Sequence, residues 1–488
     1  MPEVSPGRIA PDPTPASRHA PRRLAAALLA LALPGLPGTA LAQPAATLTA
    51  AAACRSTNPT PLTAEARAEG DAPALLAYYQ GVYDREYARH GADFERMAAQ
   101  GNGEERNYYT LEYVLMGALS LYEASGDERY LRQALRGSMA EIAHCTVIDS
   151  HGDCNWSGTW RPTTFATPAP IALPLDDAQG MTQLARLARL ILTRPALSAY
   201  RAQGVAVYRF VKAQWLDKWL NHRHAWPWFR DDMKSEAHAI DDKTVMLGEI
   251  MAHMTRAAEA QPSEARAARR FAALARRLAR GLLDHEGGRP RFTPLGSGLG
   301  IDIGRTWADD DGGCGARSID TAHANRYPAA MVAFHETGLA FDRALLRDLA
   351  AGFAETVWNQ SFAAPAFSNY VDGDNRCFRT RPAYGNGAIY LGWNMLAAYS
   401  HEMFDVADAT LRQWLAGTRN PSLEYNGSPF GIIALAGGLA RAVATGVPEP
   451  GYAPRSASSS KASTWRTMAS RTGRSSFCSQ RGGIAAAP

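Results

Sequence analysis

The feature that most constrains the fold is a helical spacing of apolar residues, which recurs from residue 73 to residue 445. Apolar side chains stand at positions i, i+3, i+4 and i+7, as in the stripe Leu184, Leu187, Ala188 and Ile191, and this spacing places them on one face of an α-helix. The segments with this pattern are 73–90, 107–124, 128–144, 176–193, 197–221, 236–260, 263–285, 321–337, 341–357, 386–401, 405–416 and 430–445. Patterns that alternate as in strands are nearly absent, so we expect an all-α fold.

The loops between these segments alternate between short and long. Ser125-Gly126-Asp127 is a short connection, whereas 286–318 and 358–385 are long ones. Twelve segments pair as six hairpins, and a closed ring of hairpins has tight turns at one end and functional loops at the other. No residue repeat of fixed length marks the hairpins. The expected fold is therefore an (α/α)6-like toroid, with a helical bundle or an α-solenoid as the alternatives.

The first part of the chain carries the pattern of an export signal. Arg22 and Arg23 precede a short apolar run, 24–36, and the small residues around Ala42 suit a signal peptidase. The run is too short to span a bilayer. We therefore expect residues 1–42 to be a secretory signal peptide and the protein to be secreted or periplasmic, without membrane contact after cleavage. An uncleaved anchor is the alternative.

The remaining chain divides into three parts. Residues 43–70 are rich in Ala, Thr and Pro and are expected to be a linker, residues 71–450 hold the toroid, and residues 451–488 have the composition of a disordered tail. The chain has 51 basic and 47 acidic residues, but residues 43–450 hold 41 basic and 45 acidic ones. The basic excess thus belongs to the ends, and we expect no nucleic acid as a partner.

Four of the six cysteines lie where pairing is plausible in an oxidising setting. Cys145 and Cys154 flank a short polar loop, and we expect a local disulfide between them. Cys314 and Cys377 lie in Gly/Asp-rich loops and form a second candidate pair. No CxxC or Cys/His spacing typical of zinc occurs, so no zinc site is expected.

The most suggestive functional segment runs from Arg317 to Tyr327, after a Gly/Asp-rich loop and at the start of a helix. His323 and Tyr327 are four residues apart, and Arg326 is three residues from His323. Such neighbours share one helix face, which can present an imidazole, a guanidinium and a phenol together. The alternative for each residue is a satisfied polar group in a helical core.

Further clusters of aromatic and polar residues stand at predicted helix starts. Trp226 and Trp228 lie in a polar stretch, and their flat rings suit the apolar faces of sugars, the alternative being packing at a helix junction. The other members of these clusters are Trp160, Arg161, Asn107, Tyr108, His238, Asp241 and Tyr384. In a toroid the starts of alternate helices converge, so we expect one cleft with the composition of a glycan site.

Over about residues 70–445 the chain resembles secreted helical-toroid carbohydrate enzymes, especially polysaccharide lyases of the alginate and glucuronan type. The resemblance rests on the export signal, the helix rhythm and the His-x-Asn-Arg-Tyr run at 323–327. It implies an enzyme that cleaves a uronic-acid-containing glycan by β-elimination, with a polysaccharide or oligosaccharide as its partner. It implies neither a metal nor another cofactor.

β-Elimination needs a group that neutralises the uronate carboxylate, a base that removes the C5 proton and an acid that protonates the leaving O4. The resemblance implies Asn325 and Arg326 as neutralisers. His323 or His238 would be the base, and Tyr327 or Tyr384 the acid. The substrate-binding residues would be Trp226, Trp228, Trp160, Arg161, Arg317, Asn107, Tyr108 and Asp241.

Two other functions stay open at this point. An inverting glycoside hydrolase on the same fold needs an acid and a base, both carboxyl groups, roughly 6.5–9.5 Å apart. Its candidates are Asp177, Asp241, Asp242, Asp320 and Glu236. A non-catalytic glycan-binding protein would keep the tryptophans but would not need the His, Tyr and Arg cluster.

Overall fold

The computed structural model describes residues 71–100, 105–145, 152–154, 174–220, 242–280, 282–286, 289–292, 321–362, 365–368, 371, 391–416 and 429–447. All of them belong to one compact unit, residues 57–488. They are mostly helical, which confirms the predicted all-α class. Among them no helix has the length and apolar character that a membrane crossing needs. The predicted signal peptide, linker and tail lie outside the described residues.

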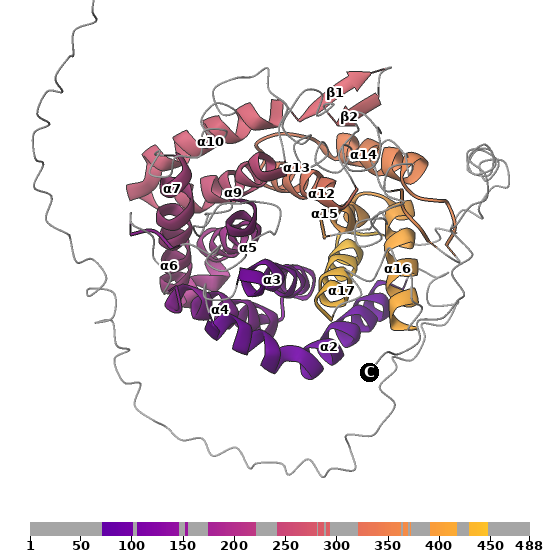
Figure 1. The fold of residues 1–488 in the computed structure, drawn as a ribbon, viewed down its shortest axis with the longest axis horizontal. Coiled ribbons are helices and arrows are strands. Elements are labelled where there is room, and N and C mark those ends of the chain that lie inside the picture. Colours follow the sequence, from indigo (N-terminus) through magenta and orange to yellow (C-terminus); the bar gives the residue numbers. More distant parts are fainter. Residues whose placement is uncertain are drawn as a thin grey trace, which may run out of the picture. The chain divides into compact units, whose positions relative to one another are not determined.

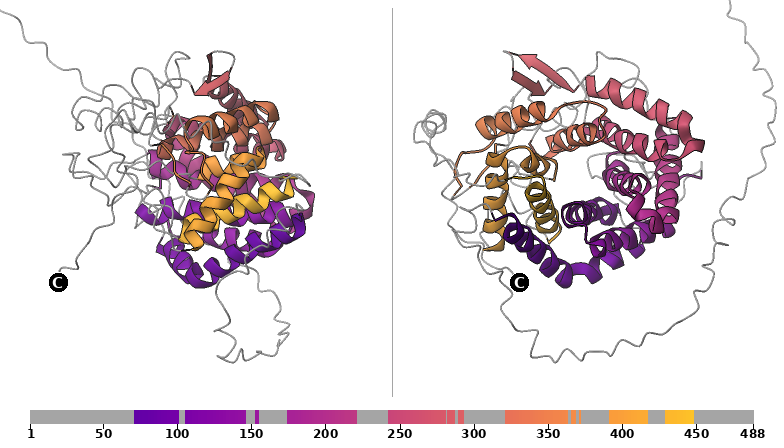
Figure 2. Two further views of the ribbon diagram at one scale, coloured as in Figure 1. Left: turned by 90° about the vertical axis from the view of Figure 1, so that its right-hand side faces the viewer. Right: turned by 180° about the vertical axis from the view of Figure 1, so that it is seen from behind.

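The helices form two layers, an inner one and an outer one that surrounds it (Figures 1 and 2). The inner layer consists of α3 (Glu105–Ser125), α5 (Pro174–Thr193), α9 (Asp242–Glu259), α12 (Thr321–Ala324), α13 (Arg326–Glu336), α15 (Leu391–Met395) and α17 (Pro429–Ala444). The outer layer consists of α2 (Ala72–Gln100), α4 (Glu128–Ala143), α6 (Arg201–Val211), α7 (Asp217–Leu220), α10 (Ala265–Arg280), α14 (Arg343–Thr356) and α16 (His401–Leu415). Inner and outer helices therefore alternate along the chain.

Contacts between the inner helices follow the order of the chain and return to their starting point. Helix α3 packs on α5, α5 on α9, α9 on α13, α13 on α15, and α15 on α17. Helix α17 then packs on α3 and also on α2. The last described helix thus lies against the first two.

The connections that lead from an inner helix to the next outer helix are short. Between α3 and α4 only Gly126 and Asp127 intervene. Gly126 has a φ of 71°, which glycine adopts without steric cost, and the Asp127 side chain accepts a hydrogen bond from the backbone N–H of Arg129 and caps α4. The predicted long connections fall largely outside the described residues.

Glycines allow the closest approaches between inner helices. A Cβ atom on Gly437 of α17 would lie 2.5 Å from the carbonyl oxygen of Gly117 in α3. A Cβ atom on Gly392 of α15 would lie 1.7 Å from the carbonyl oxygen of Asn325. Any larger residue would push these backbones apart, because protein interiors are close-packed. The contacts between α3 and α17 and between α13 and α15 therefore require glycine.

The structure differs most from the sequence-based segments in two places. Helix α2 continues to Gln100 rather than ending near residue 90, because its apolar stripe extends through the buried Phe94 and Ala98. The segment predicted as helix 263–285 ends at Arg280 and is followed by an antiparallel hairpin of β1 (Leu283–Glu286) and β2 (Arg289–Phe292), in which Leu283 pairs with Phe292. The Gly-Gly pair between these strands is a hairpin signal that the helical interpretation overlooked.

A disulfide joins Cys145, at the end of α4, to Cys154, with their Cα atoms 5.9 Å apart. This confirms the predicted local bridge, and the distance lies in the normal range. Cys154 is held in place by its neighbours as well, since its N–H donates to Gln214 at 2.6 Å and its carbonyl accepts from Nζ of the buried Lys218 at 2.9 Å. Cys314 and Cys377 lie outside the described residues.

Candidate functional site

Four of the predicted site residues have described side chains: His323, Asn325, Arg326 and Tyr327. Four further candidates lie in helices, but the structure does not describe their side chains: Asn107 and Tyr108 in α3, Asp177 in α5 and Asp242 in α9. The other predicted residues lie outside the described part of the chain, namely His238, Tyr384, Trp226, Trp228, Trp160, Arg161, Arg317, Asp241, Asp320 and Glu236.

Asn325 stands at the junction of α12 and α13. Its φ of −56° and ψ of −24° are right-handed helical, so the chain keeps a helical path from His323 to Tyr327. Its side-chain amide donates to the carbonyl of Ala322 at 2.5 Å, and its Oδ1 accepts from the N–H of Gly392 at 3.4 Å. The amide nitrogen therefore fixes the side chain on α12, and Oδ1 ties the junction to α15.

Arg326 is buried and turns toward α5. Its Nη2 donates to Oε1 of Gln179 at 2.9 Å, and its Nη1 lies 3.5 Å from the carbonyl of His323. Tyr327 is buried, whereas His323 is only half-buried. The structure thus brings Arg326 together with Gln179, a residue that is 147 positions away.

Four inner helices contribute to a layer of polar side chains around Arg326, which we call the N-terminal polar layer. Its members lie in the first halves of their helices and are Glu112 in α3, Gln179 and Thr182 in α5, Glu249 in α9, and Arg326 in α13. The Thr182 hydroxyl lies 3.2 Å from Oε1 of Glu112 and 2.9 Å from the carbonyl of Gln179. Glu112 is 7% exposed and Glu249 only 3%.

Both carboxyl groups of this layer bind their protons tightly. Burial raises the pKa of Glu112 well above its usual range, and the charge of Glu249 adds to this more than Arg326 subtracts. Burial raises the pKa of Glu249 to about 8, against the opposing effect of Arg186. At pH 7 both groups are therefore mainly neutral and can donate an O–H hydrogen bond or a proton.

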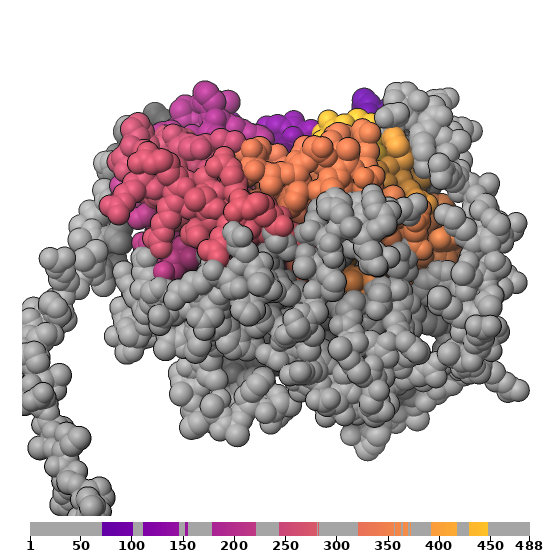
Figure 3. Space-filling view, turned by 90° about the horizontal axis from the view of Figure 1, so that it is seen from above, coloured from indigo at the N-terminus to yellow at the C-terminus, as the bar shows by residue number. Residues whose placement is uncertain are grey.

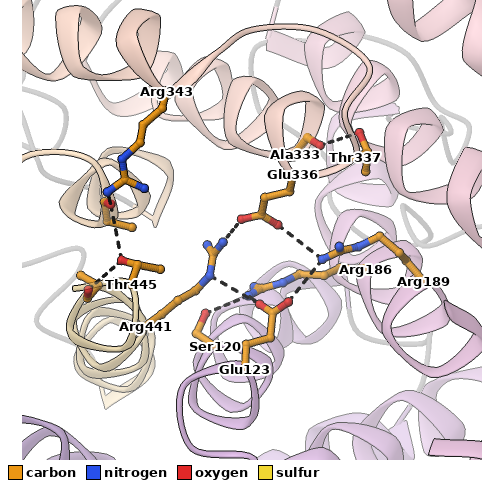
Figure 4. A network of polar contacts seen from close by, with 12 residues as sticks. Ser120, Glu123, Arg186, Arg189, Ala333, Glu336, Thr337, Arg343, Arg441 and Thr445 are labelled. Atoms are coloured by element: carbon orange, nitrogen blue, oxygen red, sulfur yellow. Dashed lines mark hydrogen bonds and ion pairs between the residues drawn. The ribbon is translucent and has the colours of Figure 1, made fainter. Parts of the chain in front are cut away.

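A second polar layer lies at the other ends of the inner helices, and we call it the arginine–glutamate cluster (Figure 4). The Glu123 carboxylate of α3 pairs with Arg186, with Arg189 at 3.3 Å, with Arg194 at 3.4 Å and with Arg441 at 3.5 Å. Glu336 of α13 pairs with Arg441 of α17 and with Arg189 at 3.4 Å. Because α3, α5 and α13 contribute their first halves to one layer and their last halves to the other, these three helices run in the same direction.

The charges of this cluster are close to balance once the helix ends are included. Its four arginines exceed its two glutamates by two charges, and burial lowers the pKa of the nearby His253, which stays neutral. The C-terminal ends of α3, α5, α13 and α17 each supply about −0.5 charge. The cluster is therefore a structural junction between four helices rather than an open anion site.

Sequence reasoning missed Glu249, Arg186 and Glu123. Each stands inside a predicted helical segment, where the local sequence assigns it no particular role. The available signal was local: Arg186 falls between Leu184 and Leu187 of an apolar stripe, where a charged residue must find a buried partner. Which partner it finds depends on helices that are distant in sequence.

Among the residues that the structure describes, no group of three or more His, Cys, Asp or Glu side chains is placed to hold a metal ion. No protein-family model matches the chain, and neither a curated protein nor a solved structure shows significant similarity to it. The N-terminal polar layer and the arginine–glutamate cluster are therefore the features of the described residues that bear on function.

Proposed function

We propose that the chain is a polysaccharide lyase that cleaves a uronic-acid-containing glycan by β-elimination, and that its helices form an (α/α)6-like toroid. The inner-helix contacts that return from α17 to α3 support the toroid. One observation carries the activity: in the N-terminal polar layer the Arg326 guanidinium lies near Glu112, a carboxyl group that keeps its proton at neutral pH, as the neighbouring Glu249 also does.

This combination suits a uronate. The substrate's carboxylate must lose its negative charge before its C5 proton becomes acidic, and Arg326 together with a neutral carboxyl group supplies donors for it. The N-terminal ends of the inner helices add positive partial charge on the same side. A carboxyl group with an ordinary pKa would repel the same substrate.

The proposed reaction then needs a base and an acid. The half-buried His323 takes the C5 proton, the electron pair of that bond forms the C4=C5 double bond, and the bond from C4 to the leaving O4 breaks. Tyr327 supplies the proton that the leaving oxygen takes up. His238 and Tyr384 are the alternatives for the two roles, as in the sequence-based prediction.

The same observation keeps Glu112 and Glu249 out of the role that an inverting hydrolase needs. A hydrolase uses one ionised carboxylate as its base, and burial keeps these two carboxyl groups protonated at pH 7. A lyase uses neutral carboxyl groups as donors. The predicted export of the chain completes the proposal, because a polymer too large to enter a cell has to be cut outside the cytoplasm.

The test is incubation with polymannuronate, polyguluronate, polyglucuronate and polygalacturonate while ultraviolet absorbance is followed. We expect absorbance from the new double bond with at least one polymer. Reducing sugar without absorbance would replace the lyase by a hydrolase, and binding without product would leave a glycan-binding protein.

Variants test the assigned residues. His323→Ala and Tyr327→Phe should abolish turnover and leave the circular dichroism spectrum unchanged. The matched controls are His90→Ala in α2 and Tyr200→Phe, which change the same residue types away from the inner helices. Full activity in both site variants would overturn the assignment.

A further inference from the structure

Gln179 of α5 joins the two groups on which the proposed function depends. Its Oε1 accepts a hydrogen bond from Nη2 of Arg326 at 2.9 Å. Arginine has donors and no acceptor, so the amide oxygen has to face Arg326 and the amide nitrogen faces the other way. Burial dominates the pKa of Glu112, but a side-chain hydrogen bond from Gln179 opposes it and lowers this pKa, as a donor to a carboxylate does. One amide therefore contacts both groups.

The amide of Gln179 is held inside the protein. Gln179 is 4% exposed and belongs to the inner layer, whereas the outer helices α10 and α14 lie on the face seen in Figure 3, in pink and orange. Its backbone carbonyl accepts from the Thr182 hydroxyl at 2.9 Å, and the same hydroxyl lies 3.2 Å from Oε1 of Glu112. A buried amide with partners at both ends cannot turn without losing them, so its orientation is set before a ligand arrives.

The neutral amide between Arg326 and Glu112 keeps both groups available to an anion. In direct contact, the guanidinium would favour the ionised form of Glu112, and the resulting ion pair would have no net charge to attract a uronate. With Gln179 between them, burial raises the pKa of Glu112 more than Arg326 lowers it. The three side chains together thus offer a carboxylate a guanidinium, an O–H group and one net positive charge.

We propose that Gln179 is a positioning residue that holds Arg326 and Glu112 together as a single subsite for the carboxylate of a uronate. The inference rests on the proposed function and names the residue that sets its preference for acidic over neutral sugars. Gln179 acts through its two neighbours and does not itself touch the substrate.

The test uses the full chain with two substitutions at this position. Gln179→Met keeps the length of the side chain and removes both hydrogen bonds, and Gln179→Glu places a carboxylate against Arg326. The matched control is Gln183→Met in the same helix. Gln183 is 1% exposed, donates to Oγ1 of Thr182 at 3.3 Å and accepts from Nη1 of Arg186 at 3.4 Å. Neither of these bonds involves Arg326 or Glu112.

Binding is measured by NMR with mannuronate, guluronate, glucuronate and galacturonate as free monosaccharides, which have no glycosidic bond to cleave. Glucose is the neutral sugar. We expect the affinity for the uronates that the wild type binds to fall on the order of tenfold in both Gln179 variants, while Gln183→Met binds like the wild type. Binding of glucose should not change. If the polymer is cleaved, kcat/KM should fall by a similar factor.

An infrared signature tests the positioning without a ligand. The band of the protonated Glu112 carboxyl is identified by its loss in Glu112→Gln. It should move to higher frequency in Gln179→Met, because the group loses a hydrogen bond, and should stay in place in Gln183→Met. Urea unfolding checks that the two Met variants are folded and have similar stability. If Gln179→Met does not fold, Gln179→Glu, which keeps the shape of the side chain, decides by its binding.

Three results would overturn the role of Gln179: wild-type affinity in its variants, an equal loss of affinity in Gln183→Met, or an unmoved carboxyl band in Gln179→Met. The lyase proposal can fail separately. Binding of a uronate without product from its polymer removes the lyase and keeps the subsite. Product formation with wild-type binding by the Gln179 variants keeps the lyase and removes the subsite, as does a wild type that binds none of the four uronates.

Discussion

Replacing Glu123 by glutamine tests how the inner helices are joined. The substitution keeps the shape of the side chain and removes a carboxylate that contacts arginines from both α5 and α17. Burial alone would raise the pKa of Glu123, but Arg186, Arg441 and Arg189 outweigh it and hold the pKa well below its usual range. The carboxylate is thus charged at neutral pH. Its loss leaves the buried Arg186 without the carboxylate that it pairs with, whereas Arg189 and Arg441 keep Glu336.

The structure sets the expected magnitude. Arg194 is 41% exposed and loses little, because water screens its contact. Arg186 is 1% exposed, and Arg189 and Arg441 are 12% and 11% exposed. Breaking such a buried pair costs about 3–5 kcal/mol. Glu259→Gln is the control, since its partner Arg256 is 37% exposed and the pair is worth at most about 1 kcal/mol.

Urea unfolding at pH 7, followed by circular dichroism, measures both variants. A Glu123→Gln protein that unfolds at the same urea concentration as Glu259→Gln would refute the reasoning. Arg186 is 1% exposed and pairs with Glu123, so adding Arg186→Met to Glu123→Gln should restore part of the loss. The contribution of Glu123 is full above its unfolded pKa near 4.5 and disappears as the pH falls through the lower folded pKa, so the variant should lose less stability on acidification than the wild type.

Three further outcomes follow from packing, covalent and titration arguments. Gly117→Ala places a Cβ atom 2.6 Å from the carbonyl oxygen of Ile433 and should lower the folding stability by about 1–3 kcal/mol. In Gly81→Ala the added Cβ atom meets nothing within 4 Å, and this variant should be more stable by about 0.5–1 kcal/mol. Equal melting temperatures of the two variants would contradict this. Changing Cys145 and Cys154 together to serine should cost about 2–3 kcal/mol and make unfolding less sensitive to reductant. The argument fails if reductant destabilises the variant as much as the wild type. The pKa of Glu249 is about 8 in the folded protein and 4.5 in its unperturbed state, so the wild type should lose a few kcal/mol of folding stability as the pH rises between these values. Glu249→Gln should flatten that part of the pH–stability curve. An equally steep curve in the variant would exclude Glu249 as the cause.

The helices could be read from the sequence because their signals are local. The segment predicted as 128–144 is α4, Glu128–Ala143, and its start is fixed by the Asp127 cap. The segment predicted as 430–445 is α17, Pro429–Ala444, where proline suits a first helical position. In both helices the apolar stripe and the residues at the helix start indicate the same helix boundary.

The candidate site could be read only in part. The run from His323 to Tyr327 was recognisable because its polar residues are adjacent in sequence. The N-terminal polar layer was not, because it joins Arg326 to Glu112 and Glu249, which come from two other helices. The raised pKa values of Glu112 and Glu249 arise from burial and from their neighbours, which a helical pattern does not encode.

The packing of α17 against α3 also bears on how the chain is made. Tyr79 of α2 donates a hydrogen bond to Asp408 at 2.9 Å, across 329 residues, and Arg441 reaches Glu123 over a similar span. A growing polypeptide cannot complete either contact until nearly all of it has been synthesised. The side of α3 that holds Gly117 stays uncovered until α17 has been made, and contacts between residues so far apart in sequence form slowly. A nascent chain of this kind remains open for most of its synthesis, which is the state in which chaperones and proteases meet it.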